Sequence, residues 1–155
     1  MVKILLTGKF VRAVDEKRRI AIPKSIRDTL KSSNNSVLYI APGTDVSLAI
    51  YTEEAFTRMA DRLAAAPPTA RDVRAFSRLF YAQASRVELD RMGRIRVPSE
   101  LAESAELGKE AVMLGVGDHL ELWNSERWAT YEREQQAKYD EIAERALGGE
   151  GGISQ

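Results

Sequence analysis

The spacing of apolar and polar residues in the first part of the chain predicts a series of short elements. In order, these are strands at Phe10–Val14 and Arg19–Ile22, a helix at Lys24–Lys31, and strands at Val37–Ala41 and Val46–Tyr51. Pro23 follows the second strand and suits the first turn of the helix. Thr52 is the expected N-cap of a further helix, because Glu53 and Glu54 follow it in the first turn.

The same pattern returns in the second half of the chain. Aligned positions keep their residue class: Asp15 with Asp90, Arg19 with Arg94, Ile20 with Ile95, Ile22 with Val97, Pro23 with Pro98, Ile26 with Leu101, and Leu48–Phe56 with Leu120–Trp128. Two separated blocks that match in the same order indicate an internal duplication. The second copy predicts strands at Ala84–Leu89, Arg94–Val97, Ala111–Leu114 and His119–Trp123, with a short helix from Ser99.

The segments outside the paired blocks also carry signals that predict their structure. Pro67 and Pro68 end the helix that starts after Thr52, and Thr69 is the expected cap of a linker helix. The last helix is expected to run to about Ala146. The sequence therefore predicts a first repeat over residues 1–66, a linker helix over 67–83, a second repeat over 84–146 and a flexible tail over 147–155.

Each repeat has the order ββαββα and is too short to bury a large core alone. Two interlocked repeats would share one core with pseudo-twofold symmetry. The expected fold class is therefore α+β.

Composition narrows the possible chemistry. The chain has no cysteine and one histidine, His119, for which a structural or surface role is expected. The lack of cysteine excludes disulfides and thiolate metal sites. A single histidine leaves little scope for imidazole-based catalysis or zinc ligation. A nucleophile elbow and a phosphate-binding glycine loop are also missing. We therefore expect no enzyme activity, no catalytic or metal-binding residues and no cofactor.

The N-terminal segment MVKILLTGKF is too short and too quickly charged for a signal peptide, and no apolar run is long enough for a membrane span. The expected location is the cytoplasm, with no membrane partner.

Charge is balanced overall but unevenly distributed. The chain holds 23 Lys and Arg against 23 Asp and Glu. Residues 1–31 nevertheless carry nine basic and three acidic side chains, whereas residues 129–155 carry three basic and six acidic ones. A basic start and an acidic end favour a polyanionic partner on one side of the molecule.

Two turns carry a resemblance to a known family. Asp15-Glu16-Lys17-Arg18-Arg19 and Asp90-Arg91-Met92-Gly93-Arg94 are each followed by the pattern apolar-x-apolar-Pro, and Leu120–Trp128 is rich in aromatic residues. In these features the chain resembles the MraZ family, over roughly residues 5–145. The resemblance implies an AbrB-like swapped-hairpin β-barrel with peripheral helices. It also implies a ring-forming, nucleoid-associated transcriptional regulator of the division and cell-wall gene cluster, which binds short direct repeats in promoter DNA.

The first turn departs from the family pattern. The family turn usually reads D-x-x-G-R, which the second copy keeps with Gly93, but the first copy has Arg18. Glycine adopts positive φ at little cost, whereas arginine does not. Either Arg18 accepts backbone strain of about 1 kcal/mol or the two turns differ in type.

The basic side chains around the turns are the candidate DNA-binding residues. Arg19 and Arg94 alternate with apolar neighbours, so they lie on the outward face of their strands. Arginine binds phosphates and guanine edges in bidentate fashion, and a two-stranded ribbon fits the DNA major groove. Asp15 and Asp90 would hold the turns while the cations bind double-stranded DNA. The full candidate set is Arg12, Asp15, Lys17, Arg18, Arg19, Arg86, Asp90, Arg91, Arg94 and Arg96.

Two other functions remain open at this point. The basic turns of one subunit could contact the acidic C-terminal helix of the next in a purely structural ring or scaffold. The chain could also be an AbrB-like antitoxin, which would bind DNA and hold a toxin with a disordered tail. The short, glycine-rich tail argues against the antitoxin.

Overall fold

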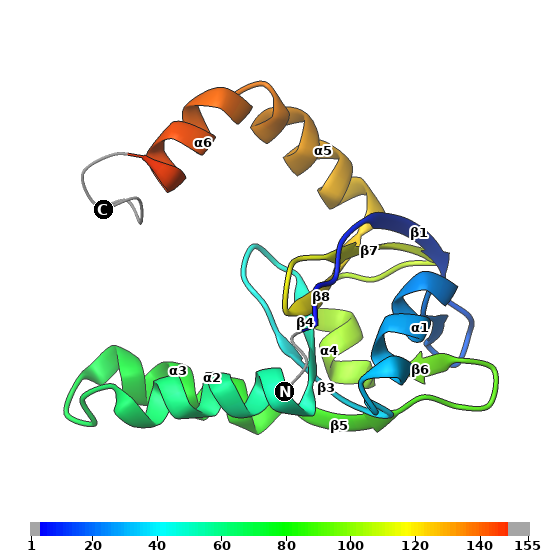
Figure 1. The fold of residues 1–155 in the computed structure, drawn as a ribbon, viewed down its shortest axis with the longest axis horizontal. Helices are drawn as coiled ribbons and strands as arrows, with labels where there is room; N and C mark the ends of the chain where they lie inside the picture. Colours follow the sequence, from blue (N-terminus) through cyan, green and yellow to red (C-terminus); the bar gives the residue numbers. More distant parts are fainter. Residues whose placement is uncertain (1–3, 149–155) are drawn as a thin grey trace. The chain divides into compact units, whose positions relative to one another are not determined.

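A computed structural model describes residues 4–148 and has an α+β fold (Figure 1). Its elements are β1 (Lys9–Ala13), β2 (Arg19–Ala21), α1 (Lys24–Ser32), β3 (Val37–Pro42), β4 (Leu48–Thr52), α2 (Glu53–Ala65), α3 (Arg71–Gln83), β5 (Ser85–Glu88), β6 (Arg94–Arg96), α4 (Ser99–Ser104), β7 (Glu110–Gly115), β8 (His119–Asn124), α5 (Ser125–Gln136) and α6 (Tyr139–Leu147). None of the helices in the described part of the chain is long and apolar enough to cross a lipid bilayer.

The two halves repeat the same order of elements, which agrees with the duplication read from the sequence. Elements β1, β2, α1, β3, β4 and α2 correspond to β5, β6, α4, β7, β8 and α5, and α3 lies between the copies. The strand expected at Val46–Tyr51 begins only at Leu48, because Asp45 and Val46 both have positive φ and belong to the preceding turn.

Strand pairing interlocks the two copies. A six-stranded antiparallel sheet has the order β1-β7-β8-β4-β3-β5, and β2 pairs with β6 in a separate two-stranded ribbon. The first strand of each copy therefore pairs with the third strand of the other copy. Exchanging the copies maps this order onto itself, so the pairing has pseudo-twofold symmetry. The pair Ile20–Ile95 lies at the centre of the ribbon.

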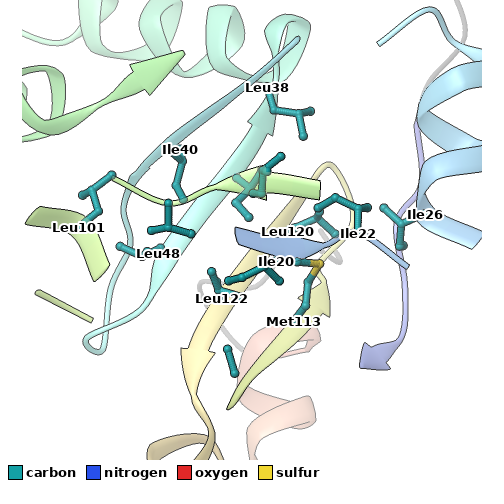
Figure 2. Packing of buried hydrophobic residues seen from close by; sticks show 14 of the residues in the cluster. Ile20, Ile22, Ile26, Leu38, Ile40, Leu48, Leu101, Met113, Leu120 and Leu122 are labelled. Carbon is teal, nitrogen blue, oxygen red and sulfur yellow. The ribbon is translucent and has the colours of Figure 1, made fainter. Parts of the chain in front are cut away.

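The main core lies on one face of the six-stranded sheet and includes side chains from both copies. Ile20 of the ribbon packs in one cluster with sheet residues such as Ile40, Leu48 and Leu120 (Figure 2). Ile95 belongs to the same cluster, and the two isoleucines are 0% and 1% exposed. Helices α1 and α4 contribute apolar side chains to the same cluster. Neither copy could form this core without the other, because it joins residues from both halves of the sequence.

A second, aromatic cluster lies on the opposite face of the sheet. Ala49 and Tyr51 of β4 point to this face, whereas their neighbours Leu48 and Ile50 point to the main core, so β4 is buried on both sides. Helices α2 and α3 lie side by side (Figure 1) and pack on the part of this face formed by β3 and β4, with Phe56 of α2 stacked against Phe80 of α3 at a ring-centroid distance of 5.7 Å.

The helix caps were predicted correctly in one case and wrongly in the other. The Thr52 side chain accepts a hydrogen bond from the Ala55 amide, as expected for an N-cap. Thr69 is not the cap of α3, which starts at Arg71 after Ala70 and has no side-chain cap. Instead, the Ala70 amide donates to the Pro67 carbonyl in a tight turn. The Arg74 guanidinium then binds the carbonyl of Thr69 at 2.8 Å.

A second compact unit begins at Glu126. The sequence predicted one helix to Ala146, which is wrong: α5 ends at Gln136 and α6 starts at Tyr139. The Lys138 amide bonds to the Gln135 carbonyl, and nothing in the local sequence explains the break. Within this unit the rings of Trp128 and Tyr131 stack at a centroid distance of 5.7 Å. Most of the tail expected to be flexible, residues 149–155, lies outside the described residues.

Candidate nucleic-acid interface

The outward face of the β2–β6 ribbon carries three arginines. Because Ile20 and Ile95 point into the core, the flanking positions Arg19, Ala21, Arg94 and Arg96 point away from it. Arg19 lies opposite Arg96, and Ala21 lies opposite Arg94. The ribbon thus brings Arg19, Arg94 and Arg96 together. The sequence had predicted only their outward direction.

The turn before each strand of the ribbon is built by an aspartate. In the first turn (residues 15–18), Asp15 Oδ1 accepts hydrogen bonds from the amides of Lys17 and Arg19, and Oδ2 accepts one from Arg19 Nε at 2.7 Å. In the second turn (residues 90–93), Asp90 makes the same three bonds, including one from Arg94 Nε at 2.9 Å. The aspartates therefore both form the turns and orient the first arginine of each strand.

These hydrogen bonds stabilise the charged form of both carboxyl groups. Donation by the Arg19 amide, followed by the Arg19 side chain and the Lys17 amide, lowers the pKa of Asp15 from 3.8 to about 2. The corresponding donors, first of all the Arg94 amide, lower the pKa of Asp90 as well. Both carboxylates are ionised at neutral pH, so each offsets the charge of one arginine.

The two turns have the same backbone conformation despite the difference between Arg18 and Gly93. Their φ angles are 63° and 75°, both in the left-handed region. The Arg18 carbonyl accepts a hydrogen bond from the Val97 amide, and the Gly93 carbonyl accepts one from the Ile22 amide, each at 2.9 Å. Arg18 therefore keeps the turn type and carries a backbone cost of about 1 kcal/mol.

Three of the candidate cations are exposed and carry no ion pair within residues 4–148. Two of them lie in the turns: Lys17 is two residues after Asp15, and Arg91 directly follows Asp90. The third, Arg96, lies on the ribbon. Arg19 and Arg94 are less exposed, at 31% and 26% of the side chain, because they bind Asp15 and Asp90. The exposed cations have the freedom to bind an external anion.

Two candidate arginines lie elsewhere. Arg12 is on β1, opposite Ala111 of β7, and Arg86 is on β5, opposite Tyr39 of β3. Both strands belong to the six-stranded sheet and not to the ribbon. Arg86 also forms an ion pair with Glu88 at 3.0 Å. The sequence-based interpretation placed Arg12 and Arg86 across a hairpin from Arg19 and Arg94, whereas β1 and β5 pair with β7 and β3 of the other copy.

The sequence reading missed Arg27 of α1. Its Nε donates to the Ile22 carbonyl at 3.0 Å, and its side chain lies against Gly93 in the second turn. The presence of a glycine in only one of two matched turns was the available signal, since it indicates a close neighbour at that turn.

The single histidine has a structural environment. His119 Nδ1 lies 2.8 Å from Asp118 Oδ1, and its ring lies 5.3 Å from that of Tyr51. Glu121 and Asp118 raise the pKa of His119, against the effect of burial. Within residues 4–148, no group of three or more His, Asp or Glu side chains is arranged to hold a metal ion.

Comparison with known proteins identifies the family. The family model described as "MraZ protein, putative antitoxin-like" matches the chain twice, over residues 5–79 and 80–149. "Transcriptional regulator MraZ" of Alkaliphilus oremlandii is 38% identical over 139 residues, which cover 90% of this chain and 94% of the relative. The proteins of that name from Lactiplantibacillus plantarum and Heliobacterium modesticaldum are 37% and 35% identical, over 90% and 92% of this chain and 96% and 97% of their own. The chain therefore belongs to the MraZ family.

Proposed function

We propose that this protein is a DNA-binding transcriptional regulator that uses the β2–β6 ribbon and its two turns as the binding surface. The observation that carries the proposal is the outward face of the ribbon, where Arg19, Arg94 and Arg96 gather with no apolar residue larger than Ala21. The relatives named transcriptional regulators support the same function.

The contacts with DNA follow from the chemistry of these side chains. A two-stranded ribbon has the right size for the major groove, where arginine recognises guanine. Asp15 and Asp90 bind the Nε atoms of Arg19 and Arg94 and leave their Nη groups without a hydrogen-bond partner among residues 4–148. In our proposal, these Nη groups and Arg96 bind base edges, whereas Lys17 and Arg91 bind phosphates.

The differences between the two copies favour a DNA site without twofold symmetry. Arg96 stands where the first copy has Ala21, so one end of the ribbon carries two arginines and the other end one. The hollow beside the first turn is lined by four acidic and two basic residues, and the hollow beside the second turn by three basic and two acidic ones. A symmetric reader binds a palindrome, whereas an asymmetric one binds a box with a direction. This supports direct rather than inverted repeats.

We extend the proposal to the arrangement expected of the family. The exchange of strands between the copies would make a swapped-hairpin barrel, and several subunits in a ring would bind tandem boxes in the promoter of the division and cell-wall gene cluster, on the nucleoid. Each weak contact would then be reinforced by the next. Phe76 and Leu79 on α3, which lie one turn apart and are 44% and 63% exposed, offer an apolar surface for a second copy of the chain. Leu79→Glu should then reduce the size of the assembly measured by light scattering.

Removal of the exposed cations tests the DNA-binding surface. The variant with Lys17→Ala, Arg91→Ala and Arg96→Ala should bind the DNA upstream of the protein's own gene at least tenfold more weakly. The plot of log affinity against log salt concentration should also become less steep, by about 0.9 for each lost phosphate contact. Fluorescence anisotropy over a series of salt concentrations measures both quantities.

A matched control removes the same charge elsewhere. The variant with Arg62→Ala, Arg71→Ala and Arg78→Ala loses three exposed cations from α2 and α3 and should keep its affinity. Equal losses in both variants would indicate nonspecific attraction and contradict the proposed surface. If the ribbon variant instead breaks up the oligomer and its DNA affinity falls only in proportion, the structural ring is the better explanation.

A further inference from the structure

An arginine holds the second turn from the helix of the other copy. The Ile22 carbonyl follows the end of β2 and precedes Pro23, so it lies outside both the β-ladder and the helix. Arg27 Nε of α1 donates to this carbonyl at 3.0 Å. The Arg27 side chain also covers the second turn, because a Cβ atom added to Gly93 would lie only 2.5 Å from Arg27 Cδ.

The symmetry-related site contains an arginine from a different position. The Val97 carbonyl precedes Pro98 and corresponds to that of Ile22. It accepts a hydrogen bond at 2.9 Å from Arg18 Nε, which belongs to the first turn. The helix position that corresponds to Arg27 is Ala102, which is 8% exposed and lines the same hollow as Arg18.

Each of the two sites therefore holds one arginine. The helix supplies it beside the second turn, and the turn itself supplies it beside the first. Where the turn has glycine, the helix has arginine (Gly93 with Arg27). Where the turn has arginine, the helix has alanine (Arg18 with Ala102). The close approach at Gly93 explains the exclusion, since two long side chains would occupy the same space. In both sites an Nε–H group satisfies the carbonyl before the proline.

We propose that Arg18 and Arg27 are interchangeable positioning residues: each fixes a turn of the reading surface to the helix beside it and does not itself read DNA. Arg18 is thus kept in a strained conformation because Ala102 leaves its site without another donor. The functional part of this inference rests on the proposed DNA binding. The structural part, the exchange of the arginine between turn and helix, does not.

A double-mutant cycle tests the exchange. Arg18→Gly alone removes the donor but also relieves backbone strain of about 1 kcal/mol, so its net effect on stability should be small. Ala102→Arg alone places two arginines in one site and should be less stable than the parent. Arg18→Gly with Ala102→Arg rebuilds the arrangement of Gly93 and Arg27. Its midpoint of urea denaturation should exceed the value expected from adding the two single changes. Additive effects would overturn the exchange.

DNA binding by the same variants tests the positioning role. Arg18→Gly should weaken binding by about fivefold to tenfold with an unchanged salt slope, and the double variant should return to within about twofold of the parent. If Arg18 instead contacts a phosphate, the salt slope should fall by about 0.9 and Ala102→Arg should give no rescue, which would overturn the positioning role. If the parent protein binds no upstream DNA, the proposed function fails while the stability cycle still decides the exchange.

A second pair of substitutions tests the exchange in the opposite direction, in case the first double variant does not fold. Gly93→Arg with Arg27→Ala should turn the second site into a copy of the first, and it should be more stable than Gly93→Arg alone. If neither double variant recovers stability relative to its single changes, the inference is wrong.

Discussion

Arg19 and Arg96 lie directly opposite each other in the β2–β6 ribbon, so two like charges share one cross-strand position. Such a pair is unfavourable in the free protein by a few tenths of a kcal/mol to about 1 kcal/mol. Asp15 offsets part of this cost through its ion pair with Arg19, whereas Arg96 has no ion pair within residues 4–148. The arrangement makes sense if an anion binds there, since binding would remove the repulsion.

Replacement of Arg96 should make the protein more stable but weaken its binding to DNA. We expect Arg96→Gln to raise the free energy of unfolding by about 0.5 kcal/mol at low salt, because the repulsion from Arg19 is removed. The same variant should bind promoter DNA more weakly. Urea denaturation at low and high salt measures the first effect, and the gain should shrink at high salt because salt screens exposed charges. Lower stability in Arg96→Gln would contradict the repulsion.

The low pKa of Asp15 predicts a loss of stability in acid. Because the folded-state pKa, about 2, is below the ordinary value of 3.8, the ionised group stabilises the protein above pH 3.8. This contribution is lost as the pH falls from 3.8 towards 2. Asp15→Asn should therefore be less stable than the parent at pH 6, and the difference should narrow below pH 4. Thermal melts at a series of pH values measure it, with Asp28→Asn on α1 as the control; a difference that does not change down to pH 2 would argue against this account.

The raised pKa of His119 predicts the opposite pH dependence. Glu121 and Asp118 favour the charged ring, so its contribution to stability is complete below pH 6.5 and is lost as the pH rises through the folded-state pKa. The parent should lose stability as the pH rises above 6.5, and His119→Gln should lose less over the same interval. Denaturation by urea at several pH values gives both slopes, and equal slopes would show that His119 makes no such contribution.

The central pair of the ribbon should be sensitive to truncation. Ile20 and Ile95 are 0% and 1% exposed and face each other across the pseudo-twofold axis. Ile20→Ala and Ile95→Ala should each lower the free energy of unfolding by about 3 kcal/mol. The double change should differ from the sum of the two, because the residues are neighbours. Val11→Ala, at a site that is 56% exposed, is the matched control and should have little effect.

The order of elements could be predicted because it depends on local signals. Three such signals act over a few residues: the alternation around Ile20 and Ile95, the prolines after β2 and β6, and the cap at Thr52. The structure has a strand or a helix at each of these places, as expected. Weak local signals misled the prediction. Thr69 has the chemistry of a cap, but the Pro67–Ala70 turn decides where α3 starts.

Part of the candidate site could also be predicted from local signals. The outward direction of Arg19, Arg94 and Arg96 on their strands follows from strand alternation alone. The positions of Arg12 and Arg86 do not, because β1 and β5 pair with strands of the other copy. Their assignment depended on long-range pairing, which residue spacing does not encode.

The sequence by itself determined the duplication, the aspartate-built turns and the outward arginines, because each depends on neighbours within a few positions. Only the tertiary structure decided how the copies interlock and what stands beside each turn. Arg18 and Gly93 occupy equal positions in equal turns, yet they differ because Ala102 lies beside one and Arg27 beside the other. These neighbours are brought together by the pairing of β2 with β6, and the packing at that contact leaves room for one arginine in each site.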